Sequence, residues 1–136
     1  MANKTYRGSC QCGRVKFEAE IDLSKGTGKC NCTACWKRRW WSVQAKPEGF
    51  RSLGGESELS EYKAGQERGH RGFCKHCGVR PYGWVDKADW NDGEYVSVNV
   101  ACLDDLDPKD LIEAPVRYMD GRNDNWWSAP AETRHL

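Results

Sequence analysis

Apolar and polar residues alternate along two segments of the chain, and this alternation predicts β-strands. In residues 15–21, Val, Phe, Ala and Ile occupy one parity, while Lys and Glu occupy the other. Residues 96–102 repeat the pattern, with three valines and Cys102 on one parity. A period of two places the apolar side chains of each segment on one face of a sheet. Both segments are therefore predicted to pack one face against a core.

Shorter patterns complete the predicted fold. Weaker strand patterns occur at residues 41–45, 50–53, 59–63 and 82–85, and turn-forming residues at 25–28, 54–55 and 91–93. One short helix is expected, because Asp107 can cap its N-terminus and Pro108 fits the first helical position. Residues 120–127 are expected to form a loop anchored by its tryptophan rings. The sequence thus predicts an all-β fold of mostly antiparallel strands, with at most one or two short helices, in a single domain spanning residues 1–136.

Composition limits how far an apolar core can stabilise this fold. Leu, Ile, Val and Phe together account for 20 of 136 residues, which is below the roughly 20% typical of globular chains. The 7 Trp and 5 Tyr residues supply further apolar area, and a net charge of +1 argues against disorder. A covalent or metal crosslink is therefore expected to support the core, and the 8 cysteines are the candidates.

Several classes of protein are disfavoured by the sequence. The N-terminal residues show no apolar signal segment, and no run of about 18 apolar residues predicts a membrane span. We therefore expect a cytoplasmic protein, in which thiols stay reduced and clustered cysteines bind metal rather than form disulfides. A pI of about 7.5 disfavours a basic nucleic-acid-binding domain.

Two of the three cysteine clusters have matching features. The clusters lie at residues 10–12, 30–35 and 74–77, and the first and last are each followed by a glycine that permits positive φ in a turn. Thiolates on such turns can lie roughly 3.8 Å apart, the edge of a tetrahedron around zinc with Zn–S bonds near 2.3 Å. These two clusters are therefore predicted to form one structural zinc site, with the ligands Cys10, Cys12, Cys74 and Cys77.

The middle cluster has a different predicted role. It supplies three thiolates, from Cys30, Cys32 and Cys35. Three protein ligands and an open position are typical of catalytic zinc. A fourth ligand from elsewhere would make the site structural instead, and the candidates are Cys102, His70 and His76. The parity of Cys102 places it among buried valines, and His76 is expected to face solvent. The favoured interpretation is an open catalytic zinc, and hence two zinc ions per chain.

Residues 36–41, directly after the middle cluster, interleave cations with tryptophan rings. They fit a solvated turn followed by a strand that buries alternate rings, a platform for single-stranded nucleic acid, or a site that captures a small anionic thiol. Of the two functional interpretations, the open metal position favours the small thiol. Its binding is then assigned to the cations Lys37, Arg38 and Arg39.

Taken together, these motifs resemble the glutathione-dependent formaldehyde-activating enzyme family, which includes centromere protein V. The resembling segments are residues 8–13 with the strand 15–21, the cluster 30–35, residues 73–78, and the strand 96–102 with residues 103–104. The resemblance implies coiled β-sheets similar to those of methionine sulfoxide reductase B. It also implies a structural zinc on the first and last cysteine pairs, a catalytic zinc on the middle three cysteines, and carbon–sulfur lyase activity. The implied partners are a small-molecule thiol such as glutathione and an aldehyde, which condense to S-hydroxymethylglutathione when the aldehyde is formaldehyde.

Two classes of function follow from the sequence. One is a zinc-dependent carbon–sulfur lyase, and the other is a binding module with two structural zinc sites and no catalysis. A zinc deaminase is disfavoured, because no His-x-Glu motif occurs and Phe73 rather than Pro precedes Cys74. Exchangeability of the fourth ligand at the middle cluster distinguishes the lyase from the binding module.

Overall fold

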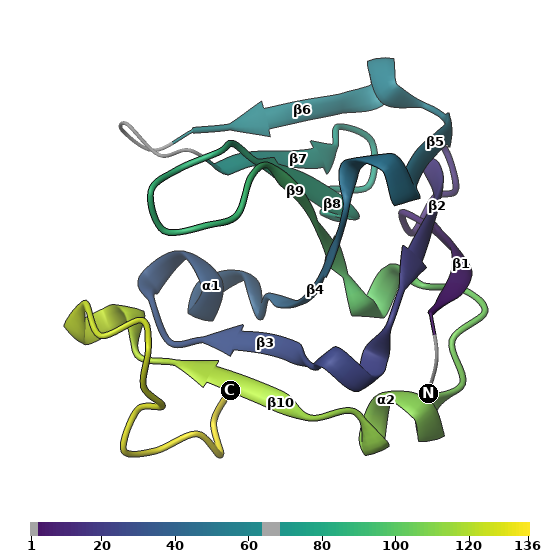
Figure 1. Cartoon of the computed structure of the whole chain (residues 1–136). Helices are drawn as coiled ribbons and strands as arrows, with labels where there is room; N and C mark the ends of the chain where they lie inside the picture. The colour runs from purple at the N-terminus through teal and green to yellow at the C-terminus, as the bar shows by residue number, and fades with distance from the viewer. Residues whose placement is uncertain (1–2, 64–68) are drawn as a thin grey trace.

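Two β-sheets make up most of the structure, a computed structural model that describes residues 3–63 and 69–136 (Figure 1). The smaller sheet has the strand order β1 (Lys4–Ser9), β2 (Lys16–Ile21), β5 (Phe50–Gly54). The larger sheet has the order β10 (Val116–Met119), β3 (Thr27–Cys30), β4 (Trp41–Ala45), β9 (Tyr95–Asn99), β8 (Tyr82–Val85), β7 (Gly69–Cys74), β6 (Leu59–Tyr62). Among the described strands, all pairings are antiparallel except that of β10 with β3. The predicted all-β class is confirmed.

The helices are short and lie at the ends of strands. The α-helices in the described residues are α1 (Thr33–Arg38) and α2 (Pro108–Glu113). The 3₁₀ turns are η1 (Leu23–Lys25), η2 (Pro47–Gly49), η3 (Glu56–Glu58), η4 (Val100–Cys102) and η5 (Gly121–Asn123). Helix α2 begins as predicted, with the Asp107 side chain accepting a hydrogen bond from the N–H of Lys109. Within the described residues, none of these helices has the length and apolar character that a membrane crossing requires.

Two sequence predictions were wrong in their details, and one helix was missed. The segment 96–102 is not one strand, because the Asn99 side chain accepts a hydrogen bond from the N–H of Ala101 and starts the turn η4. Residues 25–28 are not all turn, since β3 already begins at Thr27. Helix α1 was not predicted, and it occupies part of the segment of cations and rings.

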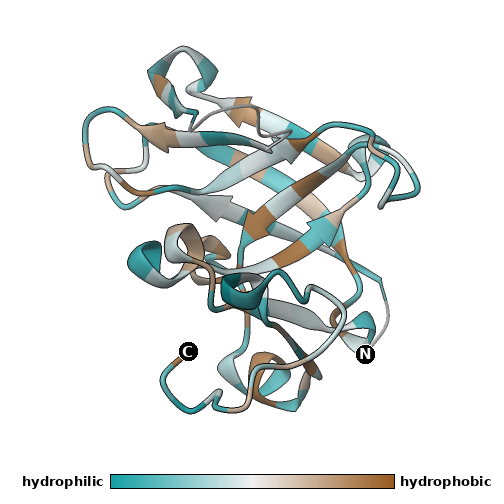
Figure 2. Ribbon diagram, turned by 90° about the vertical axis from the view of Figure 1, so that its left-hand side faces the viewer, coloured by the Kyte–Doolittle hydropathy of each residue, from teal (hydrophilic) through white to brown (hydrophobic). Residues whose placement is uncertain are grey.

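The core lies between the two sheets and follows the predicted alternation. Phe17 of β2 and Val98 of β9 are fully buried, at 0% exposure. The Phe17 ring centroid lies 5.5 Å from that of Phe50 in the smaller sheet and 5.3 Å from that of Tyr82 in the larger one. Figure 2 shows hydrophobic and hydrophilic residues alternating along the strands. Aromatic rings therefore join the sheets where aliphatic residues are few.

The turn after β5 lies close against the connection between β1 and β2. Gly55 has φ of 82°, and a Cβ atom there would overlap the main-chain oxygen of Arg14. The preceding Gly54 has φ of 143°, but its Cβ would meet no atom within 4 Å. Both positions thus favour glycine through φ, and Gly55 also requires it through close packing.

Alanine substitution separates these two effects. Gly54→Ala is expected to cost about 1–2 kcal/mol through its positive φ. Gly55→Ala carries a similar cost and in addition about 1–3 kcal/mol from the clash with the main chain. Urea denaturation of the zinc-loaded proteins measures both free energies of unfolding. Equal midpoints for the two variants would contradict the packing of this turn.

Candidate metal centres

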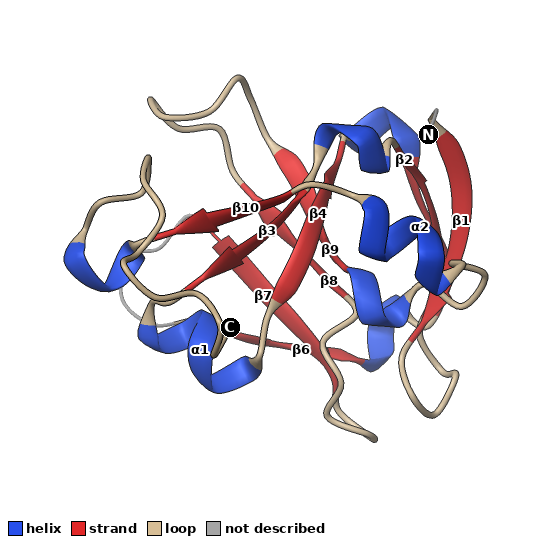
Figure 3. Cartoon of the chain, turned by 90° about the horizontal axis from the view of Figure 1, so that it is seen from below, coloured by secondary structure: helices blue, strands red, loops and turns tan. Residues whose placement is uncertain are grey.

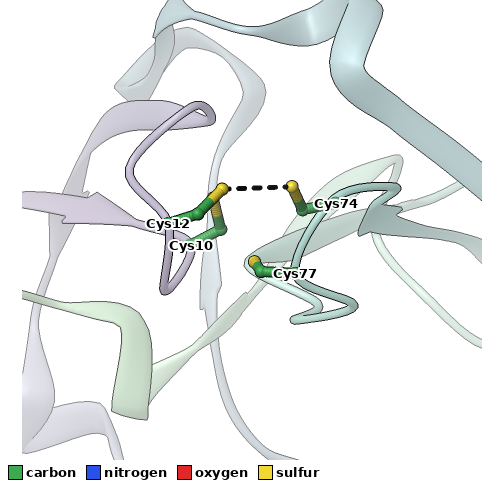
Figure 4. A group of neighbouring side chains, drawn as sticks. All are labelled: Cys10, Cys12, Cys74 and Cys77. Atoms are coloured by element: carbon green, nitrogen blue, oxygen red, sulfur yellow. Dashed lines mark hydrogen bonds between the residues drawn. The ribbon is translucent and has the colours of Figure 1, made fainter.

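Four cysteine side chains meet where a turn of the smaller sheet faces a turn of the larger sheet (Figure 4). They are Cys10, Cys12, Cys74 and Cys77, and their Sγ atoms all lie within 4.8 Å of one another. The Sγ atom of Cys12 lies 3.7 Å from the Sγ atoms of both Cys10 and Cys74. These separations are close to those of a tetrahedral zinc–thiolate site. The four-cysteine group that the spacing predicted therefore fits one zinc ion.

Each half of this group is a turn closed by a main-chain hydrogen bond from a glycine. The N–H of Gly13 donates to the Cys10 carbonyl at 3.2 Å, and the N–H of Gly78 donates to the Cys74 carbonyl at 2.7 Å. These two glycines have φ of 81° and 77°. The glycine after each cysteine pair thus adopts the left-handed conformation, as expected from its position.

Main-chain N–H groups favour the thiolate form in the four-cysteine group. The N–H of Val79, followed by that of Cys12, lowers the pKa of Cys77 to about 6. Hydrogen bonds from the main chain and side chain of Arg14 lower the pKa of Cys12. Metal binding requires thiolates, so these donors reduce the free energy that deprotonation costs.

The second group is the three-cysteine group of Cys30, Cys32 and Cys35, whose Sγ atoms also lie within 4.8 Å of one another. Cys30 ends β3, Cys32 caps the N-terminus of α1, and Cys35 lies in the first turn of that helix. The N–H of Cys32 donates to the Sγ of Cys30, and the N–H of Cys35 donates to the Sγ of Cys32, both at 3.4 Å. Hydrogen bonds from Cys30 and then Cys35 lower the pKa of Cys32 to about 2. Hydrogen bonding within the group raises the pKa of Cys30 and of Cys35, so it favours a thiolate at Cys32. The closeness of the three sulfur atoms is what fits a metal ion.

The three candidates for a fourth ligand lie outside both cysteine groups. Cys102 is buried at 6% exposure, and burial raises the pKa of its thiol to about 12. His70 hydrogen-bonds the carboxylates of Glu61 and Asp86. His76 is exposed and hydrogen-bonds Glu58. Across the part of the chain that the structure describes, the three-cysteine group therefore offers three candidate metal ligands and no fourth.

A cavity of about 130 Å³ adjoins the three-cysteine group, and we call it the thiol pocket. Its lining residues are Lys29, Cys30, Cys35, Trp36, Arg39, Trp40, Trp41 and Leu136. Burial, and to a smaller extent the charge of Arg39, lowers the pKa of Lys29. A small ligand in this cavity would thus contact sulfur, cations and aromatic rings together.

The predicted cations are placed differently from one another. Arg39 lines the thiol pocket. Arg38 lines a separate cavity beyond Trp40 and lies 5.2 Å from the ring centroid of Tyr62. Lys37 is exposed and lines neither cavity.

Lys29 lines the thiol pocket although sequence reasoning did not single it out. Its position directly before Cys30 is the one signal in the sequence that would have found it.

The loop 120–127 is held against the three-cysteine group by polar contacts. The Asn31 side chain donates to the Asp120 carboxylate at 2.8 Å and accepts from the N–H of Arg122 at 2.9 Å. Asn31 and Asp120 are buried, whereas Trp127 is 80% exposed. The expected anchoring by tryptophan is therefore wrong for Trp127, because buried hydrogen bonds hold the loop.

Gly121 allows this loop to approach the three-cysteine group. A Cβ atom there would lie 2.7 Å from the Sγ of Cys30. The loop and the three-cysteine group are thus in close contact.

A comparison of the sequence with known families agrees with this site. The family model of the glutathione-dependent formaldehyde-activating enzyme matches residues 5–118. The chain belongs to this family. Both cysteine groups of this family member lie inside the matched residues. A Rhodobacter sphaeroides protein of known crystal structure is similar to the chain, with a TM-score of 0.67 and 30% sequence identity over 82% of this chain and 99% of that protein.

We predict two zinc ions per chain with unequal roles. Cys74→Ser is expected to unfold or aggregate the protein, because it breaks the contact between the two sheets. Cys35→Ser is expected to retain the fold and lose one zinc ion. Elemental analysis and circular dichroism of chelator-free preparations measure both outcomes. Loss of the fold in Cys35→Ser would instead favour two structural sites.

Cys102 provides a matched test of the ligand assignment. Cys102→Ala is expected to retain both zinc ions and to lower the free energy of unfolding by about 1 kcal/mol, as for a small change of core volume. Metal content and urea denaturation measure the two effects. Release of one zinc ion from this variant would show that Cys102 is a ligand.

Proposed function

We propose that the chain is a zinc-dependent carbon–sulfur lyase that acts on the adduct of a thiol and an aldehyde. The proposed substrate is S-hydroxymethylglutathione, formed from glutathione and formaldehyde, or a related adduct. The observation that carries the proposal is the three-cysteine group, which borders a pocket lined by cations and rings. Membership of a family described as formaldehyde-activating and glutathione-dependent supports the same chemistry.

The reaction needs a thiolate next to an aldehyde in a restricted space. Zinc held by Cys30, Cys32 and Cys35 would lower the pKa of a thiol and polarise the aldehyde oxygen. The rings of Trp36 and Trp40 line the pocket, where they would limit the access of water to the reacting groups. The new bond joins the thiol sulfur to the aldehyde carbon, and the thiol proton ends on the former carbonyl oxygen, so no oxidant or reductant is required.

Cations near the pocket would assist binding of an anionic thiol. Glutathione carries carboxylates at neutral pH, and the charges of Lys37, Arg38 and Arg39 would attract them. Arg39 is the one of these three that lines the pocket. Binding is therefore expected to weaken as salt concentration rises.

A zinc-crosslinked binding module without catalysis is the second candidate. It is favoured by one observation: the described residues that line the thiol pocket include no His, Asp or Glu. General acid or base catalysis by such a side chain would therefore need a group from outside this lining. A binding module would hold the thiol without accelerating its reaction.

Exchange spectroscopy by NMR on glutathione and formaldehyde distinguishes these candidates. The wild-type protein is expected to accelerate exchange between free glutathione and the adduct by tenfold or more, about 1.4 kcal/mol of barrier. Cys35→Ser is expected to lose the acceleration, because it removes one metal ligand. Cys102→Ala is the matched control and is expected to keep it, since Cys102 lies outside both groups.

Cobalt substitution separates binding from catalysis in the same proteins. Glutathione is expected to change the ligand-field and thiolate charge-transfer bands of the wild type, but not those of Cys35→Ser. A spectral response without faster exchange would support the binding module or another aldehyde. No response to any small thiol would contradict an open thiol-binding position.

A further inference from the structure

The C-terminal residues of the sequence fold back onto the thiol pocket. We call residues 133–136 the tail. The N–H of Leu136 donates to the carbonyl of Thr133 at 3.0 Å, which closes a turn. Figure 3 shows the end of the chain beside α1. Leu136 lines the thiol pocket together with Cys30 and Cys35.

The tail is held by two cations of the pocket. The Nζ of Lys29 donates to the main-chain oxygen of Leu136 at 3.0 Å. The Nη1 of Arg39 donates to the main-chain oxygen of His135 at 2.6 Å. The His135 ring also contacts Trp36 edge-on, with centroids 5.0 Å apart. Two consecutive residues of the chain thus present their oxygens to two cations beside the three-cysteine group.

These contacts show what kind of ligand the two cations can bind. Lys29 and Arg39 are donors without acceptor capacity, and their positive charge strengthens hydrogen bonds to carboxylate oxygens. Their separation already suits two oxygens on neighbouring units of a peptide, because the tail supplies them in that form. A thiol that carries amide and carboxylate oxygens therefore matches the chemistry of the pair.

The size of the cavity indicates that the tail and a ligand compete. With the tail in place, the thiol pocket measures about 130 Å³, whereas sites for small organic ligands usually measure about 300–1,000 Å³. Because Leu136 forms part of the lining, moving the tail would enlarge the pocket. The same movement would release both cations for a new partner.

The main chain at Arg39 gives independent support for a role of its side chain. Arg39 ends α1 in the left-handed conformation, with φ of 54°. Such a conformation costs about 1–2 kcal/mol for a residue with a Cβ atom, and glycine would avoid most of that cost. Its N–H donates to the carbonyl of Trp36 at 3.2 Å, which fixes the direction in which the side chain leaves the helix.

We propose that Lys29 and Arg39 bind the carboxylate or carbonyl oxygens of the thiol substrate, and that the tail is an internal competitor for them. The identity of the ligand as an anionic thiol rests on the proposed function. The tail lies beyond residues 5–118, which the family model matches. Ligand access in this chain is thus controlled by residues outside the matched region.

Binding of S-methylglutathione to the zinc-loaded full chain tests the proposal by calorimetry. This probe keeps the carboxylates of glutathione but has no free thiol, so it reports on the cations without a sulfur–metal bond. The double substitution His135→Gly and Leu136→Gly removes the ring contact with Trp36 and the side chain in the pocket. This double variant is expected to bind S-methylglutathione about three- to tenfold more tightly, because the conformation with the tail away from the pocket becomes more populated.

Substitutions of the cations are expected to act in the opposite direction. Lys29→Met and Arg39→Asn should each weaken binding of S-methylglutathione about tenfold or more, since each removes a charged donor. Asparagine is chosen at position 39 because it tolerates positive φ. Lys46→Met is the matched control, as Lys46 is exposed and lies outside the thiol pocket, and it should bind as the wild type does.

Three results would overturn the proposal. One is weaker binding of S-methylglutathione by the tail variant, which would make the tail part of the binding site, or unchanged binding, which would show that the tail does not affect the site. Another is equal binding by Lys29→Met and Lys46→Met. The third is absence of binding in both the wild type and the tail variant.

Failure of the proposed function gives a different result. In one case, the protein does not accelerate glutathione exchange, while the variants bind S-methylglutathione with the expected order of affinities. That result would refute the lyase activity and support the tail as an internal competitor. If the protein accelerates exchange while all variants bind S-methylglutathione with equal affinity, the lyase activity is supported. Competition by the tail is then refuted.

Discussion

The four sulfur atoms of Cys10, Cys12, Cys74 and Cys77 are the constraint on which the rest of the structure depends. They connect the turn between β1 and β2 with the turn after β7, so they join the two sheets. A structural zinc ion contributes about 10–16 kcal/mol of apparent binding free energy. This is comparable to the whole stability of a typical domain, about 5–15 kcal/mol. Zinc bound to these four sulfur atoms would therefore help a small aromatic cluster to hold the two sheets together in a chain with few aliphatic residues.

The two cysteine groups differ in how the main chain surrounds them, and this difference agrees with the different roles that we propose for them. In the four-cysteine group, two turns approach from two sheets and bring four sulfur atoms together, enough to fill a tetrahedral site. In the three-cysteine group, one segment that runs from β3 into α1 supplies all ligands. A single segment surrounds a metal from one side, and the other side adjoins the thiol pocket. An incomplete set of ligands beside a cavity is what exchange of a ligand requires.

Strands were predictable from the sequence where apolar side chains on the buried face alternate with polar side chains on the exposed face. Strand β2 alternates clearly, and β4 and β8 have the predicted bounds. Strand β1 was missed because one of its inward residues is Gly8, which has no apolar side chain to show the pattern. That glycine is required by packing, since a Cβ atom there would lie 2.8 Å from the main-chain oxygen of Cys102. Helix α1 was missed because Cys32 and Arg39 end it in place of the usual capping residues.

The candidate site was predictable only as far as its residues are close in the sequence. Spacing was sufficient to find both cysteine groups, because each contributing cluster is a local motif. The surroundings of the three-cysteine group depend instead on the parallel pairing of β10 with β3, which places Met119 opposite Cys30. This pairing brings Asp120 within hydrogen-bonding distance of Asn31. The C-terminal residues that follow accept hydrogen bonds from Lys29 and Arg39. Parallel pairing of segments so far apart has no local signature. The candidate metal ligands are thus encoded by short motifs, while the surroundings of the three-cysteine group depend on a long-range contact.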